Sequence, residues 1–169
     1  DQPGPVIDSI PGVDALCFGS SDGSLIIHAA GGTGAILFSI DNGTTSQLLN
    51  NFSNLAAGTY DVVITDANGC TSVAQATINE PTLLQLNGST TTSTCSDNNG
   101  EINVNAIGGT GTYQFSIDGG PLQSGTSFLN LLSGNYNITV TDANGCTQTE
   151  PFQVTDQPAP VINSAPVVD

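Results

Sequence analysis

The chain has 169 residues, of which 15 are Asp or Glu and none is Lys or Arg, so its formal net charge at pH 7 is −15. Without these cations it has nothing to neutralise phosphate, which excludes nucleic-acid binding and polybasic docking to a membrane surface. Hydrophobic residues make up 37% of the chain but form no run near the roughly 18 residues of a membrane span. We therefore expect a folded chain without direct membrane insertion.

Strands with alternating apolar and polar residues follow one another along the chain, and each recurs after 76 or 77 residues. In chain order, the apolar positions and their second copies are Leu25, Ile27 and Ala29 (Ile102, Val104 and Ala106); Ile36, Phe38 and Ile40 (Tyr113, Phe115 and Ile117); Tyr60, Val62 and Ile64 (Tyr136, Ile138 and Val140); and Ala76 and Ile78 (Phe152 and Val154). Because successive side chains of a strand point to opposite faces, these positions mark the core face of each strand. No stretch has the spacing of an amphipathic helix, so the sequence predicts an all-β fold.

Turn motifs recur at the same spacing and divide the chain into modules. They are Gly-Gly-Thr-Gly at 31–34 and 108–111, Phe-Ser-Ile-Asp at 38–41 and 115–118, and Thr-Asp-Ala-Asn-Gly-Cys at 65–70 and 141–146. The segment at 1–9 returns in closely similar form at 156–164, which predicts that the chain begins and ends at one phase of a two-module unit. We therefore expect the end of a preceding module at 1–3, one module at 4–80, a second at 81–157 and the first strand of a further module at 158–169.

A Gly followed two residues later by a Tyr opens one strand in each module: Gly58 and Tyr60 in the first, Gly134 and Tyr136 in the second. A Tyr at the start of the penultimate strand, after a corner containing Gly, is typical of the tyrosine corner of immunoglobulin-like domains. Short strands in a module of this length suit a small Greek-key sandwich. We therefore expect tandem immunoglobulin-like Greek-key β-sandwiches in a head-to-tail array, with these four residues in structural roles.

One succession of motifs runs through both modules. Each has a Cys, then Asp-Gly or Asn-Gly, an alternating strand, Gly-Gly-Thr-Gly, an aromatic strand, Leu-x-x-Gly-x-Tyr and Thr-Asp-Ala-Asn-Gly-Cys. This order resembles the SprB repeat of gliding-motility surface adhesins in Bacteroidetes and of related secreted repeat proteins, and the resemblance covers nearly the whole chain twice. It implies an extracellular, cell-surface location, a repetitive stalk or filament, and a role in attachment or gliding motility.

Two cysteines lie at matching positions in each module, and export would make them disulfide candidates rather than metal ligands. One hypothesis pairs them within modules, Cys17 with Cys70 and Cys95 with Cys146. The other joins Cys17 to Cys146 across the modules and leaves Cys70 and Cys95 for modules upstream and downstream. In an immunoglobulin-like topology the cysteines of one module lie at opposite ends, roughly 23 Å apart along a strand, whereas a disulfide needs Cα atoms within about 7 Å. This favours the pairing across modules, and both hypotheses remain open.

Acidic residues gather in turns, where hard oxygen ligands suit Ca²⁺. Asp and Asn also favour turns because of their own hydrogen bonds to the backbone, and we prefer this second interpretation. The calcium hypothesis places ions at module junctions, with Asp14, Asp22 or Asp41 facing Asp142. It predicts a higher melting temperature in millimolar Ca²⁺, and no other cofactor is indicated.

No arrangement of catalytic residues recurs in both modules, so we expect no enzymatic activity. The expected function is a stiff, acidic structural or adhesive segment of a cell-surface protein, whose partners are neighbouring modules and surface polysaccharide. One alternative is a carbohydrate-binding module, although the chain has no Trp for a sugar-binding platform. A second alternative is an accessory domain of a secreted enzyme.

Overall fold

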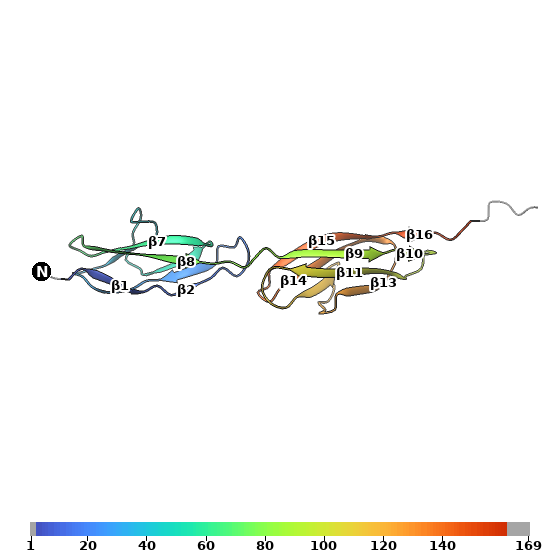
Figure 1. The fold of residues 1–169 in the computed structure, drawn as a ribbon, viewed down its shortest axis with the longest axis horizontal. Coiled ribbons are helices and arrows are strands. Elements are labelled where there is room, and N and C mark those ends of the chain that lie inside the picture. The colour runs from blue at the N-terminus through green and yellow to red at the C-terminus, as the bar shows by residue number, and fades with distance from the viewer. Residues whose placement is uncertain (1–2, 162–169) are drawn as a thin grey trace, which may run out of the picture. The chain divides into compact units, whose positions relative to one another are not determined.

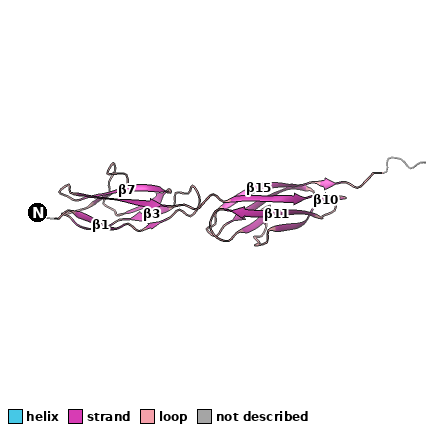
Figure 2. Cartoon of the chain, viewed as in Figure 1, coloured by secondary structure: helices cyan, strands magenta, loops and turns pink. Residues whose placement is uncertain are grey.

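The computed structural model describes residues 3–161, and the chain divides into two compact units, Asp1–Thr82 and Leu83–Asp169. The described residues form strands, turns and loops without a helix, so the predicted all-β fold is confirmed (Figure 2). Within this part of the chain there is accordingly no helix long and apolar enough to cross a membrane.

Each unit contains eight of the strands in the described residues (Figure 1). In unit 1 they are β1 (Pro5–Ser9), β2 (Gly12–Val13), β3 (Gly23–Ile26), β4 (His28–Gly31), β5 (Leu37–Ser39), β6 (Asn51–Leu55), β7 (Gly58–Thr65) and β8 (Thr71–Ile78). In unit 2 they are β9 (Gln85–Thr91), β10 (Ser93–Thr94), β11 (Gly100–Ile107), β12 (Gln114–Ile117), β13 (Ser127–Leu131), β14 (Gly134–Thr141), β15 (Thr147–Val154) and β16 (Asp156–Gln157).

Unit 1 is a sandwich of two antiparallel sheets. One sheet has the strand order β2-β3-β6 and the other β5-β7-β8, and β1 pairs with β4 beside them. The inward side chains of both sheets form one buried cluster: Ala15, Leu25, Ile27, Phe38, Val62, Ile64, Ala76 and Ile78. Because this cluster takes residues from both sheets, it is the layer that holds them face to face.

Unit 2 repeats this architecture. Its sheets have the orders β13-β11-β9 and β12-β14-β15, and β10 pairs in parallel with β16. The buried cluster is Leu84, Leu86, Ile102, Val104, Ala106, Phe115, Phe128, Ile138, Val140 and Val154. The apolar positions predicted from the alternating pattern therefore supply most of the core of both units.

The first alternating strand differs between the units. The sequence predicts one continuous strand through Leu25, Ile27 and Ala29, but in unit 1 it is divided into β3, which pairs with β2 and β6, and β4, which pairs with β1. The strand opposite is interrupted at Pro11, which has no N–H to donate to a ladder. In unit 2 a serine, Ser89, stands at this place, and β9 and β11 pair without a break.

The expectations for the two ends fall largely outside the described residues. A strand of a further module was expected at 158–169, but residues 162–169 are not described, and 158–161 contain no strand. Of the preceding module's expected end at 1–3, only Pro3 is described.

Candidate functional site

A buried carboxylate joins two turns at one end of unit 1. Asp66 begins the turn between β7 and β8 and is only 5% exposed. Its Oδ2 accepts a hydrogen bond from the backbone N–H of Thr33 (2.9 Å), and its Oδ1 accepts those of Asn68 and Cys70 (both 2.9 Å). The Gly-Gly-Thr-Gly motif and the Asp-Ala-Asn-Gly-Cys motif are thereby held together by one side chain.

The same connection recurs in unit 2. Asp142 is 6% exposed, and its Oδ2 accepts the N–H of Thr110 at 2.8 Å. Its Oδ1 accepts the N–H groups of Asn144 and Cys146, both at 2.9 Å. We call the two arrangements, centred on Asp66 and Asp142, the carboxylate clamps.

The double glycine of each clamp leaves room for the carboxylate. Gly109 has φ 60°, and a Cβ there would lie 2.6 Å from Asp142 Oδ2. Gly32 has φ 73°, and its Cβ would lie 3.1 Å from Asp66 Cβ. A larger residue would therefore meet both backbone strain and a steric clash.

The clamp also sets the acidity of Asp66. The N–H of Thr33 lowers the pKa of this carboxyl most, and those of Cys70 and Asn68 lower it further, while desolvation opposes them. Donors that stabilise the charged form keep the carboxylate ionised at neutral pH. The sequence analysis did not single out Asp66 as a site residue, although its motif recurs letter for letter with the same spacing to Gly-Gly-Thr-Gly.

The four carboxylates of the calcium hypothesis each accept hydrogen bonds from their own unit. The donors are the Asn79 N–H for Asp14 (2.8 Å); the Leu16 N–H (3.1 Å) and Ser20 hydroxyl (2.6 Å) for Asp22; the Thr45 N–H (2.9 Å), Thr45 hydroxyl (2.7 Å) and Ser39 hydroxyl (2.7 Å) for Asp41; and the clamp donors for Asp142. Among the described residues, no three or more His, Cys, Asp or Glu gather as a metal cluster. These turns thus use their acids as hydrogen-bond acceptors.

Asp41 is the most acidic of these groups. The backbone N–H of Thr45 lowers its pKa to about 2, with the Thr45 and Ser39 hydroxyls adding to the effect. The same carboxylate closes the loop after β5, because Thr45 lies four residues further along the chain.

Each unit has a tyrosine tied to the corner that precedes it. The hydroxyl of Tyr60 donates to the carbonyl of Ala56 at 2.8 Å, and that of Tyr136 donates to Leu132 at 3.0 Å. A tyrosine near the start of a strand, bonded to a carbonyl a few residues upstream, has the geometry of a tyrosine corner. Gly58 and Gly134 begin these strands, β7 and β14.

The four cysteines differ in oxidation state. Cys17 and Cys146 are disulfide-bonded, whereas Cys70 and Cys95 are free and exposed. Neither pairing within a module, Cys17 with Cys70 or Cys95 with Cys146, is therefore formed.

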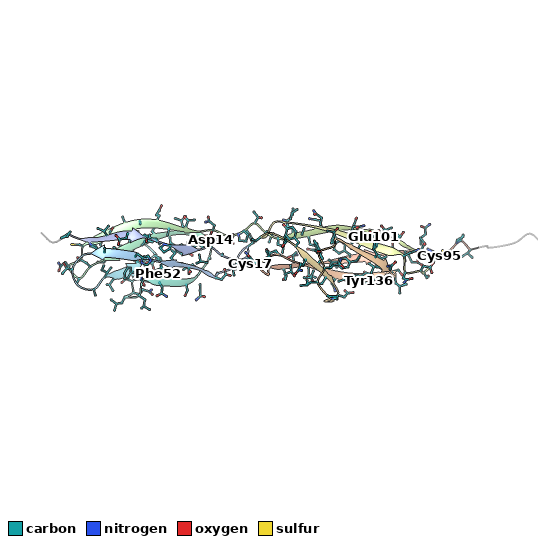
Figure 3. The ribbon with its side chains drawn as sticks, turned by 90° about the horizontal axis from the view of Figure 1, so that it is seen from below. Asp14, Cys17, Phe52, Cys95, Glu101 and Tyr136 are labelled. Atoms are coloured by element: carbon teal, nitrogen blue, oxygen red, sulfur yellow. The ribbon has the colours of Figure 1, made fainter. Side chains whose placement is uncertain are left out.

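The fold of unit 2 gives the reason. The Cys95 N–H donates to the carbonyl of Gln157 at 2.9 Å, beside β10 and β16 at the far end of β15 (Figures 1 and 3). Cys146 immediately precedes the first residue of β15. Eight residues of extended strand span roughly 26 Å, well beyond the Cα separation of about 7 Å that a disulfide allows.

A shallow hollow lies on the outer face of β7 and β8. Its volume is about 440 Å³, and it is lined by Asn42, Asp61, Val62, Val73, Ala74 and Gln75. Sugar-binding surfaces commonly stack a ring against aromatic side chains, and this lining contains none.

Comparison with known proteins identifies the repeat. The sequence model of the SprB repeat family matches residues 12–45 and 87–122, one segment in each unit, which confirms the predicted resemblance. No curated protein matches the chain.

Solved structures are similar only at a distance. Domains 7, 8 and 9 of the S-layer protein SbsC align at 9% identity and TM-score 0.33, covering 95% of this chain, which spans 64% of that chain. The amphioxus IgVJ-C2 molecule aligns at 15% identity and TM-score 0.32, over 91% of this chain and 97% of that one.

Proposed function

We propose that this chain, which carries two SprB repeats, is a segment of a stiff, acidic stalk in an extracellular cell-surface protein that serves attachment or gliding motility. The observation that carries the proposal is the carboxylate clamp, which both units build with the same contacts and nearly the same distances. A repeat that invests its most similar motif in holding its own turns has the design of a spacer rather than of a binding site.

The energetic reason is local. Each clamp gives three backbone N–H groups an ionised acceptor, and charge-assisted hydrogen bonds are stronger than neutral ones. Together with the buried cluster between the sheets, this closes the end of the sandwich where the turns would otherwise open first. A module that resists local opening suits a stalk that transmits force.

The surface chemistry suits an extracellular spacer. Trypsin-like proteases cleave after Lys or Arg, and the chain has neither. Its charge of −15 makes neighbouring copies repel one another, which discourages lateral clumping.

The oxidation states of the cysteines support a disulfide between Cys17 and Cys146 as part of this proposal, because Cys70 and Cys95 are free. Digestion at Asp and Glu without reductant, followed by mass spectrometry, tests it. A linked pair of peptides that contain Cys17 and Cys146 is expected. A peptide pair that joins Cys17 to Cys70 would contradict it.

The stalk is tested against the carbohydrate-binding alternative by retention on surfaces. The purified fragment is passed over polysaccharides and abiotic surfaces, with and without calcium, beside an unrelated acidic protein of similar charge. We expect retention no greater than that of the acidic control, because the hollow on β7 and β8 lacks aromatic rings. Saturable binding to one glycan would overturn the spacer role and make the repeats themselves adhesive.

The accessory-domain alternative leads to a different result. An accessory domain of a secreted enzyme would raise the activity of a catalytic domain in the same parent protein. Deletion of the repeats from a parent protein should leave catalysis unchanged and reduce attachment or gliding if the stalk proposal holds. Loss of an enzymatic activity with unchanged attachment would favour the accessory domain.

A further inference from the structure

We propose that Cys70 and Cys95 are linking thiols, which form a disulfide between one copy of this chain and another, Cys70 of one copy with Cys95 of the next. The inference concerns the partner of the segment and rests on the repetition of its modules. It does not depend on the adhesive role, so a fragment that fails every surface-binding test can still pass this one.

The first step compares the cysteines that follow the clamps. The N–H of Cys70 donates to Asp66 at 2.9 Å, and its carbonyl accepts the Asp66 N–H at 3.0 Å. Cys146 makes the same two bonds to Asp142, at 2.9 and 3.0 Å. The two units thus hold this backbone in one conformation, and in one of them the thiol is already oxidised.

The second step concerns the cysteines of the loops before β3 and β11. In both loops an acid that follows the last long strand holds the residues after the cysteine. Glu80 accepts the N–H of Gly19 at 2.5 Å, and Asp156 accepts that of Ser96 at 3.0 Å. Again one member of the pair, Cys17, is oxidised, and the other, Cys95, is free and exposed.

The third step follows from the two classes. The oxidised cysteines are one from each class, a clamp cysteine and a loop cysteine. The free ones, Cys70 and Cys95, are also one from each class. A copy that offers one member of each class has the pattern of a heterologous contact, which joins copies head to tail and continues instead of closing a dimer.

The bond requires an oxidant. The two thiols lose two protons and two electrons, and a small-molecule disulfide such as oxidised glutathione takes up both and becomes two thiols. The reaction passes through a mixed disulfide that the second protein thiolate attacks. Reactive cysteines usually lie beside a cation that stabilises the thiolate; this chain has no Lys or Arg, and its copies repel each other at −15. We therefore expect slow linking that accelerates as salt screens the repulsion.

The experiment incubates the purified chain with a glutathione redox buffer at low and high salt. Products are separated on a non-reducing gel and mapped by mass spectrometry. The wild type should form a ladder of covalent oligomers, faster at high salt, whose linked peptides join Cys70 to Cys95. A ladder linked through Cys70–Cys70 or Cys95–Cys95, or no ladder, would overturn the proposal.

Matched variants separate directed pairing from random oxidation. C70S retains Cys95, C95S retains Cys70, and neither can extend beyond a dimer. In an equal mixture, random pairing makes about half of all dimers mixed, so the proposal requires the mixed dimer to dominate clearly. C70S/C95S should stay monomeric under all conditions. Equal yields of mixed and self-paired dimers would show that these are ordinary exposed thiols.

Discussion

At the scale of single residues, the clamp carboxylates are the groups whose loss the units should tolerate least. Asp142 satisfies three backbone N–H groups from two different turns while it is itself buried. An N–H group buried without an acceptor loses its hydrogen bonds to water and gains nothing in return. One carboxylate therefore keeps both turns compatible with the folded state.

The first prediction concerns Asp142→Asn. Asparagine keeps one acceptor oxygen and replaces the other by an amide that points a donor at an N–H. We expect a loss of roughly 1–3 kcal/mol in the free energy of unfolding, measured by urea denaturation. Asp97→Asn is the control, because its carboxylate is exposed and accepts none of the clamp bonds, and it should change stability by less than about 0.5 kcal/mol. Equal effects of both variants would show that charge, not the clamp, matters.

The second prediction concerns pH. The pKa of Asp41 in the folded chain is about 2, below the usual value of 3.8, and that of Asp66 is also lowered. Groups whose pKa is lower in the folded state stabilise it above the unfolded pKa, and this contribution is lost as pH falls toward the folded pKa. The melting temperature should therefore fall between about pH 5 and pH 2.

Asp41→Asn isolates the contribution of one group. This variant has no proton to gain at position 41, so its melting temperature should be lower than that of wild type at neutral pH and should fall less on acidification. Thermal unfolding followed by circular dichroism at each pH gives the two curves. Parallel curves over the whole range would contradict the role assigned to Asp41.

At the scale of elements, β11 shows how the core face of one strand supports a unit. Ile102 is fully buried between the sheets, whereas Ile107 on the same strand is 50% exposed. The two side chains are chemically identical, but only the first gives up its whole surface to neighbours. Burial, not residue type, decides their contribution.

The third prediction follows from this pair. Ile102→Val removes one buried methylene and should cost about 0.5–1.5 kcal/mol. Ile107→Val removes the same group from a half-exposed position and should change stability by less than about 0.5 kcal/mol. Urea denaturation of both variants measures the difference. Equal losses would mean that β11 is buried on both faces.

At the scale of the whole molecule, the charge has one sign. With 15 acidic side chains and no Lys or Arg, almost every interaction between charged side chains at neutral pH is repulsive. Such repulsion opposes the compact state, and salt weakens it. The stability of this chain should therefore rise with ionic strength, where many proteins would lose the benefit of their salt bridges.

The fourth prediction separates screening from calcium binding. NaCl, MgCl₂ and CaCl₂ at equal ionic strength should each raise the melting temperature by a few degrees, since screening does not depend on the identity of the ion. The candidate carboxylates Asp14, Asp22 and Asp41 already accept hydrogen bonds from their own turns. Differential scanning calorimetry measures the shifts. A rise specific to millimolar Ca²⁺ would support the calcium hypothesis instead.

The sequence by itself determined the features that depend on local periodicity. Alternation of apolar residues predicts strands because side chains of a strand alternate between faces, and Ile102 and Val104 accordingly lie in the core of unit 2. Repetition at a fixed spacing predicts two similar units for the same reason: similar sequences bury similar faces. The SprB resemblance, now confirmed at two segments, came from motif order.

Only the tertiary structure decided the features that depend on groups far apart in the chain. Asp66 meets the N–H of Thr33, and Asp142 meets that of Thr110, more than 30 residues away in each case. A recurring Asp-Ala-Asn-Gly motif reads as a turn because its local bonds are all that the sequence displays. The partner that makes it a clamp is brought there by the packing of the sheets, which no local pattern encodes.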